Sequence, residues 1–210
     1  QTCALPISPI EKKNNTMALA IGFLLPAAIL FLQELLNNKV RSLKELRRTC
    51  PNTTILGIVP QDHSEPHSDL PTINDPLSIT SECFRTLRAK LNFIVADNGH
   101  KLILLSSCNP GEGKTYCVVN LAVNFALSVL KCAIINYDLR RPRLEKALNL
   151  PRGNKGITDY LVFNAEMDEI IQKTEIDNLF CITSGSIPPN PTELISTKKN
   201  KELIDEIKNR

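Results

Sequence analysis

Residues 104–115, which read LLSSCNPGEGKT, limit the possible folds more than any other part of this chain. An apolar run at 102–105 precedes them, as expected of a buried strand, and apolar residues recur at helical spacing from Tyr116 onwards. Between the two, Gly111 and Gly113 allow backbone N–H groups to turn towards phosphate oxygens at the positive end of the following helix. A strand, a glycine-rich loop and a helix in this order predict a phosphate-binding loop in an α/β fold.

The loop also carries the side chains that a nucleotide site of this kind requires. Lys114 would reach the β- and γ-phosphates, and Thr115 would hold Mg²⁺ through its hydroxyl. The strict pattern G-x-x-x-x-G-K-[ST] has glycine where this chain has Cys108, but the tightest turns are expected at Pro110-Gly111 and at Gly113. An ordinary glycine-rich turn with an unrelated Lys-Thr pair explains this context less well. The residues predicted to bind nucleotide are Asn109, Pro110, Gly111, Glu112, Gly113, Lys114, Thr115 and Tyr116.

A second chemical group follows a predicted strand at 132–137. Asp138 comes directly after this strand, in the segment IINYDLRRP. Ligands of open α/β sheets bind beyond the carboxyl ends of the strands, so this carboxylate would face the phosphate crevice. We predict that Asp138 is a metal ligand or a general base. The alternative, an aspartate that caps a helix, is disfavoured because two arginines and Pro142 intervene.

The most apolar segment is 17–32, where sixteen consecutive residues lack a polar side chain. With the residues up to 36 it approaches the roughly 20 that cross a bilayer. A signal peptide and a buried core helix are the alternatives. A polar helical pattern follows in place of a cleavage site, however, and Pro26 is unusual inside a soluble helix. We therefore predict a transmembrane helix at 17–36.

Basic residues predict the orientation of this helix. Two lysines precede it, whereas five basic residues follow it closely, which places the C-terminal side in the cytoplasm. The residues concerned are Lys12 and Lys13 before the helix, and Lys39, Arg41, Lys44, Arg47 and Arg48 after it.

The remaining segments are less informative. Residues 37–50 read as a basic helix ended by Pro51, residues 55–59 as a short strand, and 61–76 as an exposed linker in which His63 and His67 are solvated. The net charge of +3 is mild and the basic residues are spread along the chain, which by itself argues neither for nor against a nucleic-acid partner. We expect no nucleic acid among the partners. The seven cysteines form no CxxC pair, which favours reduced thiols over a metal site.

Three charged residues share one face of a helix predicted at 79–96. Glu82, Arg85 and Arg88 lie opposite an apolar stripe, which is formed by Phe84, Leu87, Leu91 and Ile94. The charged face is either solvated or a subunit contact in which arginines pair with carboxylates of a neighbour.

Four motifs together resemble the cytoplasmic domain of bacterial tyrosine kinases. They are the loop SSCNPGEGKT, the segment IINYDLRRP, the pattern E-x-x-R-x-x-R at Glu82, Arg85 and Arg88, and the segment GSIPPNPTELI from Gly185. In that family the domain is fused to, or paired with, a membrane protein that controls the chain length and export of capsular polysaccharide or exopolysaccharide. PISP at 6–9, the apolar segment and ILGIVP are similar to the end of that co-polymerase region.

The resemblance implies roles for residues at matching positions. Lys114 and Asp138 would be catalytic, Thr115 and Asp138 would bind Mg²⁺, and the cofactors would be ATP and Mg²⁺. The Glu82, Arg85 and Arg88 helix would form a ring-type homo-oligomer. The kinase domain would lie in the cytoplasm at the bacterial inner membrane, with the polysaccharide export and polymerisation machinery as partner.

One position departs from the family pattern. The first acidic residue of the family's D-x-D-x-R motif is Asn136 here, and an amide is a weaker Mg²⁺ ligand than a carboxylate. We expect Asn136→Asp to raise autophosphorylation, unless the asparagine serves only as a hydrogen-bond donor beside the site.

Two family features do not occur in this sequence. No Walker B carboxylate follows the loop, and the three tyrosines form no cluster at the C-terminus. We expect the kinase domain to be C-terminally incomplete and the fragment to be inactive alone. The alternatives are a non-catalytic, membrane-anchored co-polymerase scaffold that binds ATP, and a ParA/MinD-like ATPase, whose signature lysine is replaced here by Asn109.

The predicted architecture is a P-loop NTPase domain of the α/β class with a mainly parallel sheet, preceded by one transmembrane helix. We expect strands near 102–107, 132–137 and 178–183, and helices near 79–96, 114–129 and 197–208. The predicted regions are a periplasmic end at 1–16, a membrane helix at 17–36, a juxtamembrane segment and linker at 37–77, and the kinase domain at 78–210.

Overall fold

The computed structural model describes residues 11–37, 40–61, 69–94, 102–140, 142–151, 153 and 155–209. The chain divides into two compact units, Gln1–Thr54 and Ile55–Arg210. The histidines of the predicted linker, His63 and His67, lie outside the described residues.

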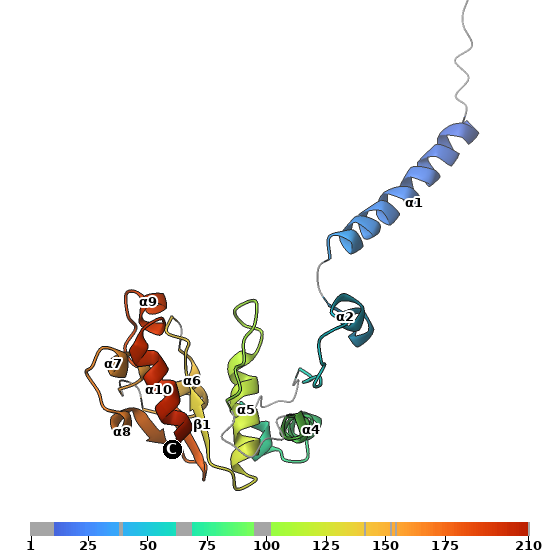
Figure 1. Ribbon diagram of the computed structural model, residues 1–210. Helices are drawn as coiled ribbons and strands as arrows, with labels where there is room; N and C mark the ends of the chain where they lie inside the picture. Colours follow the sequence, from blue (N-terminus) through green and yellow to red (C-terminus); the bar gives the residue numbers. More distant parts are fainter. Residues whose placement is uncertain are drawn as a thin grey trace, which may run out of the picture. The chain divides into compact units, whose positions relative to one another are not determined.

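The described part of the first unit contains two helices (Figure 1). Helix α1 (Glu11–Leu35) contains Pro26, and its part from Asn14 to Leu35 is long and apolar enough to cross a membrane. Helix α2 (Leu43–Thr49) begins at Ser42, whose hydroxyl accepts a hydrogen bond from the backbone N–H of Glu45 at 3.2 Å. The predicted basic helix at 37–50 is therefore shorter than expected, and it is separate from α1.

The second unit contains a small sheet with helices on both faces (Figure 1). Its helices are α3 (Pro71–Asn74), α4 (Ile79–Ile94), α5 (Lys114–Ala126), α6 (Leu144–Ala147), α7 (Ile157–Leu161), α8 (Met167–Ile170), α9 (Pro191–Ile195) and α10 (Lys198–Asn209). Its strands are β1 (Cys132–Ile135), β2 (Ile171–Lys173) and β3 (Leu179–Ile182).

The strands of the described residues are ordered β1-β3-β2. Strand β1 is parallel to β3 with Cys132 opposite Leu179, and β2 is antiparallel to β3 with Ile171 opposite Ile182. A parallel pair needs a crossover connection, and the segment that carries α6, α7 and α8 supplies it.

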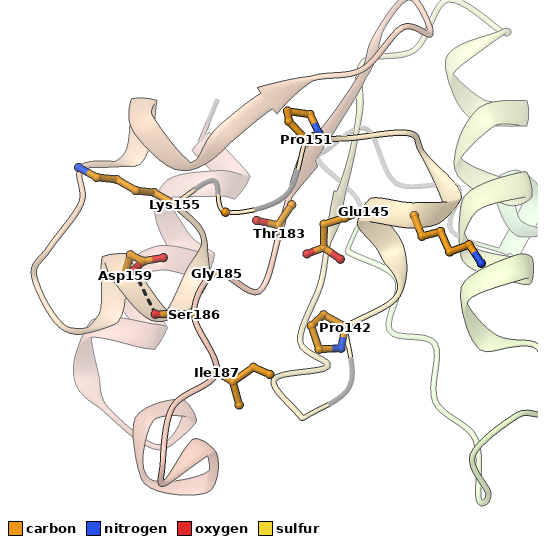
Figure 2. Close-up of a pocket in the computed structure, with 11 residues that line it drawn as sticks. Pro142, Glu145, Pro151, Lys155, Asp159, Thr183, Gly185, Ser186 and Ile187 are labelled. Atoms are coloured by element: carbon orange, nitrogen blue, oxygen red, sulfur yellow. Dashed lines mark hydrogen bonds between the residues drawn. The ribbon is translucent and has the colours of Figure 1, made fainter.

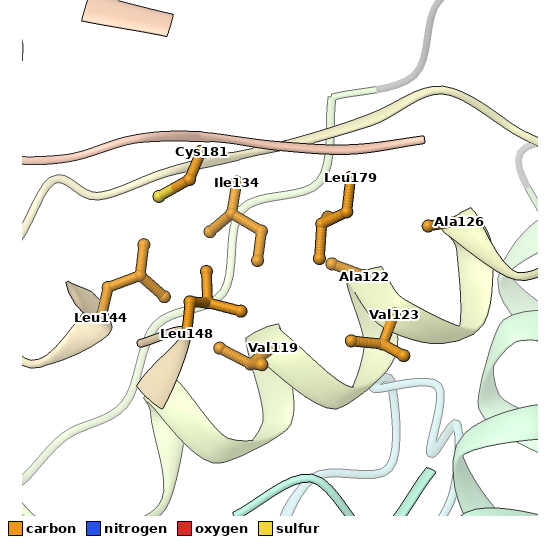
Figure 3. Close-up of a cluster of buried hydrophobic side chains, with 9 residues drawn as sticks. All are labelled: Val119, Ala122, Val123, Ala126, Ile134, Leu144, Leu148, Leu179 and Cys181. Carbon is orange, nitrogen blue, oxygen red and sulfur yellow. The ribbon is translucent and has the colours of Figure 1, made fainter. Parts of the chain in front are cut away.

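Alternation along the strands sends apolar side chains to both faces of the sheet. On one face, Ile134 and Leu179 pack against Val119 and Val123 of α5, and Figure 3 shows these side chains meeting between the helix and the strands. On the other face, Ile182 belongs to a cluster formed with α7, α8 and α10. This arrangement agrees with the predicted α/β class.

The predicted strand at 102–107 is wrong for the described structure. Residues 102–107 form no strand, and Leu104 remains 87% exposed. A strand exists only through hydrogen bonds to a neighbouring strand, and β1 uses one edge for β3 while no described segment pairs with 102–107.

The predicted strand at 55–59 is not formed either. This segment lies against α4, where the Leu56 carbonyl accepts a hydrogen bond from Lys90 Nζ at 2.6 Å. A Cβ atom at Gly57 would come within 3.0 Å of the Leu87 side chain. The apolar residues of this segment therefore cover a helix and do not extend a sheet.

Candidate functional site

The glycine-rich loop leads directly into α5. Gly113 precedes the helix with φ of 89°, and Gly111 has φ of 86°. Within the loop, 108–113, these two glycines alone have positive φ. Cys108 therefore needs no glycine conformation, which explains in backbone terms why the loop tolerates its departure from the strict pattern.

Hydrogen bonds brace the loop from one end to the other. Lys114 Nζ donates to Ser107 Oγ at 2.9 Å, and the same hydroxyl donates to the Asn109 carbonyl at 3.0 Å. The Asn109 amide donates to Glu112 Oε1 at 3.0 Å, and hydrogen bonds from its side chain and backbone lower the pKa of the Glu112 carboxyl. Ser107 is outside the residues predicted from the motif, because the strict pattern begins one position later.

The first turn of α5 carries two more of the predicted residues. Thr115 is half-buried in this turn. The Tyr116 ring packs against Phe84 of α4, with ring centroids 5.8 Å apart. The α4 helix thus supports the helix that presents the loop.

Asp138 lies just beyond β1, in a segment whose first residue is hydrogen-bonded to β3. The Asn136 N–H continues the ladder by donating to the Ile182 carbonyl at 2.9 Å. Two successive turns follow, in which the backbone N–H of Asp138 donates to Asn136 Oδ1 at 3.1 Å and the backbone N–H of Arg140 donates to Asp138 Oδ1 at 3.3 Å. The Asp138 side chain is exposed to solvent.

The topology brings the loop and Asp138 to one end of the unit. Helix α5 runs away from the loop, and the chain turns and returns as β1, packed against the same helix. The start of α5 and the end of β1 therefore lie at the same end (Figure 1). Lys114 and Thr115 begin α5 and Asp138 follows β1, and the roles of these three residues in binding and catalysis stay predictions.

The donors at this end suit Mg²⁺ bound to a nucleotide better than a free metal ion. No group of three or more His, Cys, Asp and Glu side chains that could hold a metal occurs in the described part of the chain. Mg²⁺ is usually held by one or two carboxylates together with phosphate oxygens and water. Thr115 and Asp138 fit that requirement, with phosphate supplying the remaining oxygens.

A cavity of about 410 Å³ opens beyond the carboxyl ends of β1 and β3. Figure 2 shows Glu145 and Thr183 facing one another across it, with Pro142 and Ile187 at the same end. Motif reasoning did not predict this cavity, although Ile187 belongs to the segment GSIPPNP that carried part of the resemblance.

The floor of the cavity is tightly built. The Asp159 carboxylate accepts hydrogen bonds from the Gly156 N–H at 2.9 Å and from Ser186 Oγ at 3.2 Å. Gly185 has φ of 75°, and a Cβ atom there would overlap the same carboxylate. The Asp159 carboxylate therefore links the segment at Gly156 to the segment at Gly185 and Ser186, and fixes the two segments relative to each other.

The three charged residues of α4 do not act as one group. Glu82 and Arg85 form an exposed ion pair at 2.7 Å, and Arg85 also donates to the Pro76 carbonyl. Arg88 points towards α5 and donates to the backbone carbonyl of Asn124 at 2.8 Å. Of the three, Glu82 and Arg85 are therefore better placed to meet a second subunit.

Comparison with known proteins gives consistent relatives, although no family model matches the chain. The tyrosine-protein kinase YwqD of Bacillus subtilis is 39% identical over 134 residues, which are 64% of this chain and 56% of that protein. The putative tyrosine-protein kinase CapB of Staphylococcus aureus is 34% identical, over 64% of this chain and 58% of that protein. The chain therefore spans little more than half the length of these two relatives.

Solved structures agree with the sequence relatives. The chimerical protein CapA2B2 superposes with a TM-score of 0.70 at 32% identity, over 79% of this chain and 70% of that chain. The kinase domain of the Escherichia coli tyrosine kinase ETK has a TM-score of 0.73 at 23% identity, over 82% of this chain and 70% of that chain, which supports the fold alone.

Proposed function

Because this chain belongs to the bacterial tyrosine-protein kinases of capsule and exopolysaccharide loci, we propose that the protein transfers the terminal phosphate of ATP to tyrosines of proteins. The observation that carries this proposal is that the start of α5, where Ser107 braces Lys114, lies at the same end of the unit as the end of β1, which Asp138 follows. A glycine-rich loop alone binds phosphate, whereas phosphoryl transfer also needs a carboxylate beside it.

Each residue has a distinct part in this proposal. Lys114 and the N–H groups at the start of α5 bind the phosphates and stabilise negative charge that moves during transfer. Asp138 accepts the proton of the tyrosine hydroxyl. The phenol oxygen bonds to the γ-phosphorus, and the bond from that phosphorus to the bridging oxygen of ADP breaks. Mg²⁺, held by Thr115 and Asp138, would neutralise phosphate charge.

We propose that the acceptor tyrosine comes from outside the described residues. All three tyrosines of the chain are buried or half-buried in the second unit. Tyr160 is 4% exposed, and Tyr137 donates its hydroxyl proton to Asn200 Oδ1 at 2.6 Å while burial raises its pKa to about 12. We assign the acceptor segment to the cavity beside Ile187, since it opens at the same sheet edge that carries Asp138.

Calorimetry tests the nucleotide site directly. We expect the wild-type chain in detergent to bind Mg·ATP and Lys114→Met to lose measurable binding, because the loop loses its charge on the phosphates. Lys131→Met is the matched control, since Lys131 is exposed just before β1, at the far end of the strand from Asp138. Undiminished binding by Lys114→Met, or equal losses in both variants, contradicts the proposal. Transfer of labelled phosphate to tyrosine is then measured with the full-length gene product.

We further propose that the protein is a homo-oligomer that acts with the polysaccharide export and polymerisation machinery at the bacterial inner membrane. Helix α1, by its length and composition, is the candidate anchor. The five basic residues that follow it favour a cytoplasmic kinase domain. A membrane-impermeant thiol reagent applied to intact cells should label Cys3 but spare Cys50 and Cys83. Labelling of Cys83 from outside would reverse this orientation.

A scaffold that binds ATP without phosphoryl transfer is the second candidate function. The amide of Asn136, at the position where the family pattern has a carboxylate, favours it. Binding of Mg·ATP together with no tyrosine phosphorylation by the full-length gene product would support the scaffold over the kinase.

A further inference from the structure

Asn136 is held through both its backbone and its side chain. Its backbone N–H donates to the Ile182 carbonyl of β3 at 2.9 Å, which continues the parallel ladder one residue beyond β1. Its side-chain oxygen accepts the backbone N–H of Asp138 at 3.1 Å. Both ends of the residue are therefore fixed at the carboxyl edge of the sheet.

The Asp138 N–H also fixes which way the amide of Asn136 points. A backbone N–H can donate only to the oxygen of the amide, so Oδ1 must lie on that side and Nδ2 on the other. In this orientation Nδ2 is buried and donates to no protein atom of the described residues. A buried donor without an acceptor costs free energy, and native proteins seldom keep one without a reason.

We propose that Asn136 Nδ2 donates a hydrogen bond to a phosphate oxygen of the bound nucleotide. This inference rests on the proposed function, because that function places a nucleotide at this edge. An N–H group cannot ligate Mg²⁺, but it satisfies an anionic oxygen well. Asn136 thus recognises the phosphate itself and leaves Asp138 as the carboxylate that this segment offers to the metal.

The same geometry distinguishes two interpretations of why asparagine stands at 136, where the family pattern has a carboxylate. If the amide were only a weakened metal ligand, its oxygen would be the functional atom, but that oxygen already accepts the Asp138 N–H. The atom without a protein partner is the nitrogen. The geometry therefore favours the donor interpretation, and it reverses the effect expected from Asn136→Asp.

Nucleotide binding by two variants and one control tests the assignment. Asn136→Asp keeps the accepting oxygen and replaces the donor with a second acceptor, which would repel phosphate. Asn136→Ala removes the donor without adding charge. Asn178→Asp adds the same charge at the opposite end of the sheet, where Asn178 precedes β3 and its carbonyl accepts the Cys132 N–H.

Calorimetric titration with Mg·ATP should give dissociation constants that rise by about tenfold or more for Asn136→Asp and about threefold or more for Asn136→Ala. Asn178→Asp should bind as the wild-type chain does. Thermal unfolding without nucleotide identifies variants that fail to fold, and Asn136→Ala decides the matter if Asn136→Asp is one of them.

Three results would overturn the assignment: tighter or unchanged binding by Asn136→Asp, unchanged binding by Asn136→Ala, or an equal loss in Asn178→Asp. Failure of the wild-type chain to bind Mg·ATP is a different outcome, and it refutes the proposed function itself.

Discussion

Lys114 donates a hydrogen bond to the hydroxyl of Ser107, seven residues earlier in the chain, at 2.9 Å. The bond joins the start of α5 to the segment that enters the loop, so the ammonium group is already placed before a nucleotide arrives. Since Ser107 Oγ also donates to the Asn109 carbonyl, the hydroxyl connects the charged side chain to the loop backbone.

Removing this hydroxyl should weaken nucleotide binding. We expect Ser107→Ala to raise the dissociation constant of Mg·ATP by about three- to tenfold, the range for the loss of one ordinary hydrogen bond. Ser107→Thr keeps the hydroxyl and should restore most of the affinity. Ser106→Ala, at the exposed neighbouring position, should have no effect in the same calorimetric measurement. Equal affinities of the wild-type chain and Ser107→Ala for Mg·ATP would show that the hydrogen bond from Lys114 to Ser107 does not contribute to nucleotide binding.

Thiol labelling provides an independent test of where the nucleotide lies. Cys108 in the loop and Cys50 in the first unit are both exposed. Mg·ATP should slow the labelling of Cys108 by a maleimide and leave that of Cys50 unchanged, as mass spectrometry of the digested protein can report. If both labelling rates stay the same at saturating Mg·ATP, the nucleotide does not cover the loop.

The half-buried thiol of Cys132 and the buried thiol of Cys181 should respond to pH in the direction that their pKa shifts predict. Burial raises the pKa of Cys132 from 9.0 to about 11. Burial, with the nearby Glu145 charge, raises that of Cys181 to about 12. A raised pKa means less thiolate at a given pH, so at pH 8 Cys132 should hold roughly a hundredfold less thiolate than a thiol of ordinary pKa. Its labelling should accelerate as the pH rises towards 11, and a rate that does not change with pH would contradict the raised pKa of Cys132.

Substitutions of the two arginines of α4 should have different effects, because Arg88 stabilises the fold and Arg85 is placed to contact a second subunit. Arg88→Ala removes a charged donor from the Asn124 carbonyl and should destabilise the fold by about 1–3 kcal/mol, which lowers the melting temperature by several degrees. Arg85→Ala breaks an exposed ion pair with Glu82 and an exposed hydrogen bond to the Pro76 carbonyl. Because solvent can replace both interactions, this substitution should cost less, about 0–1 kcal/mol. If the Glu82 and Arg85 face is a subunit contact, Arg85→Ala should instead reduce the oligomer seen by light scattering.

A change at the cavity should affect the protein substrate and spare the nucleotide. Ile187 is 67% exposed at the cavity, so Ile187→Asp should fold normally while placing a charge where the acceptor segment is assigned. We expect the KM for a tyrosine peptide to rise about tenfold with the full-length gene product, and Mg·ATP affinity to stay the same. Ile195→Asp, on α9 outside the cavity, is the matched control. An unchanged KM would show that the acceptor segment does not bind in this cavity.

Features controlled by local chemistry could be predicted from the sequence. Helices α4, α5 and α10 begin within two residues of the positions expected from apolar spacing, and β1 and β3 fall inside their predicted ranges. The loop was recognised because Gly111 and Gly113 allow positive φ, a property of single residues.

Features that depend on distant partners could not be predicted. The segments at 55–59 and 102–107 have strand-like composition, but whether a strand forms is decided by a neighbour that composition does not name. The orphan nitrogen of Asn136 depends on a turn that occupies the other atom of the same amide. The cavity depends on three segments, 142–151, 153–159 and 183–187, the last of which is separated from the other two in sequence.

The close approach of Gly156 and Gly185 limits which substitutions could make the cavity resistant to an inhibitor. A side chain at Gly156 would overlap the backbone at Gly185 and Thr183, and that backbone cannot withdraw easily, since the Thr183 carbonyl accepts the Ile157 N–H at 2.9 Å. Few substitutions could therefore alter the cavity wall at Gly185, against which the buried Gly156 packs, without disrupting the fold, so a small molecule that contacts Gly185 would meet few resistant variants. A compound that depends on Ile187 would lose its contact through one tolerated substitution.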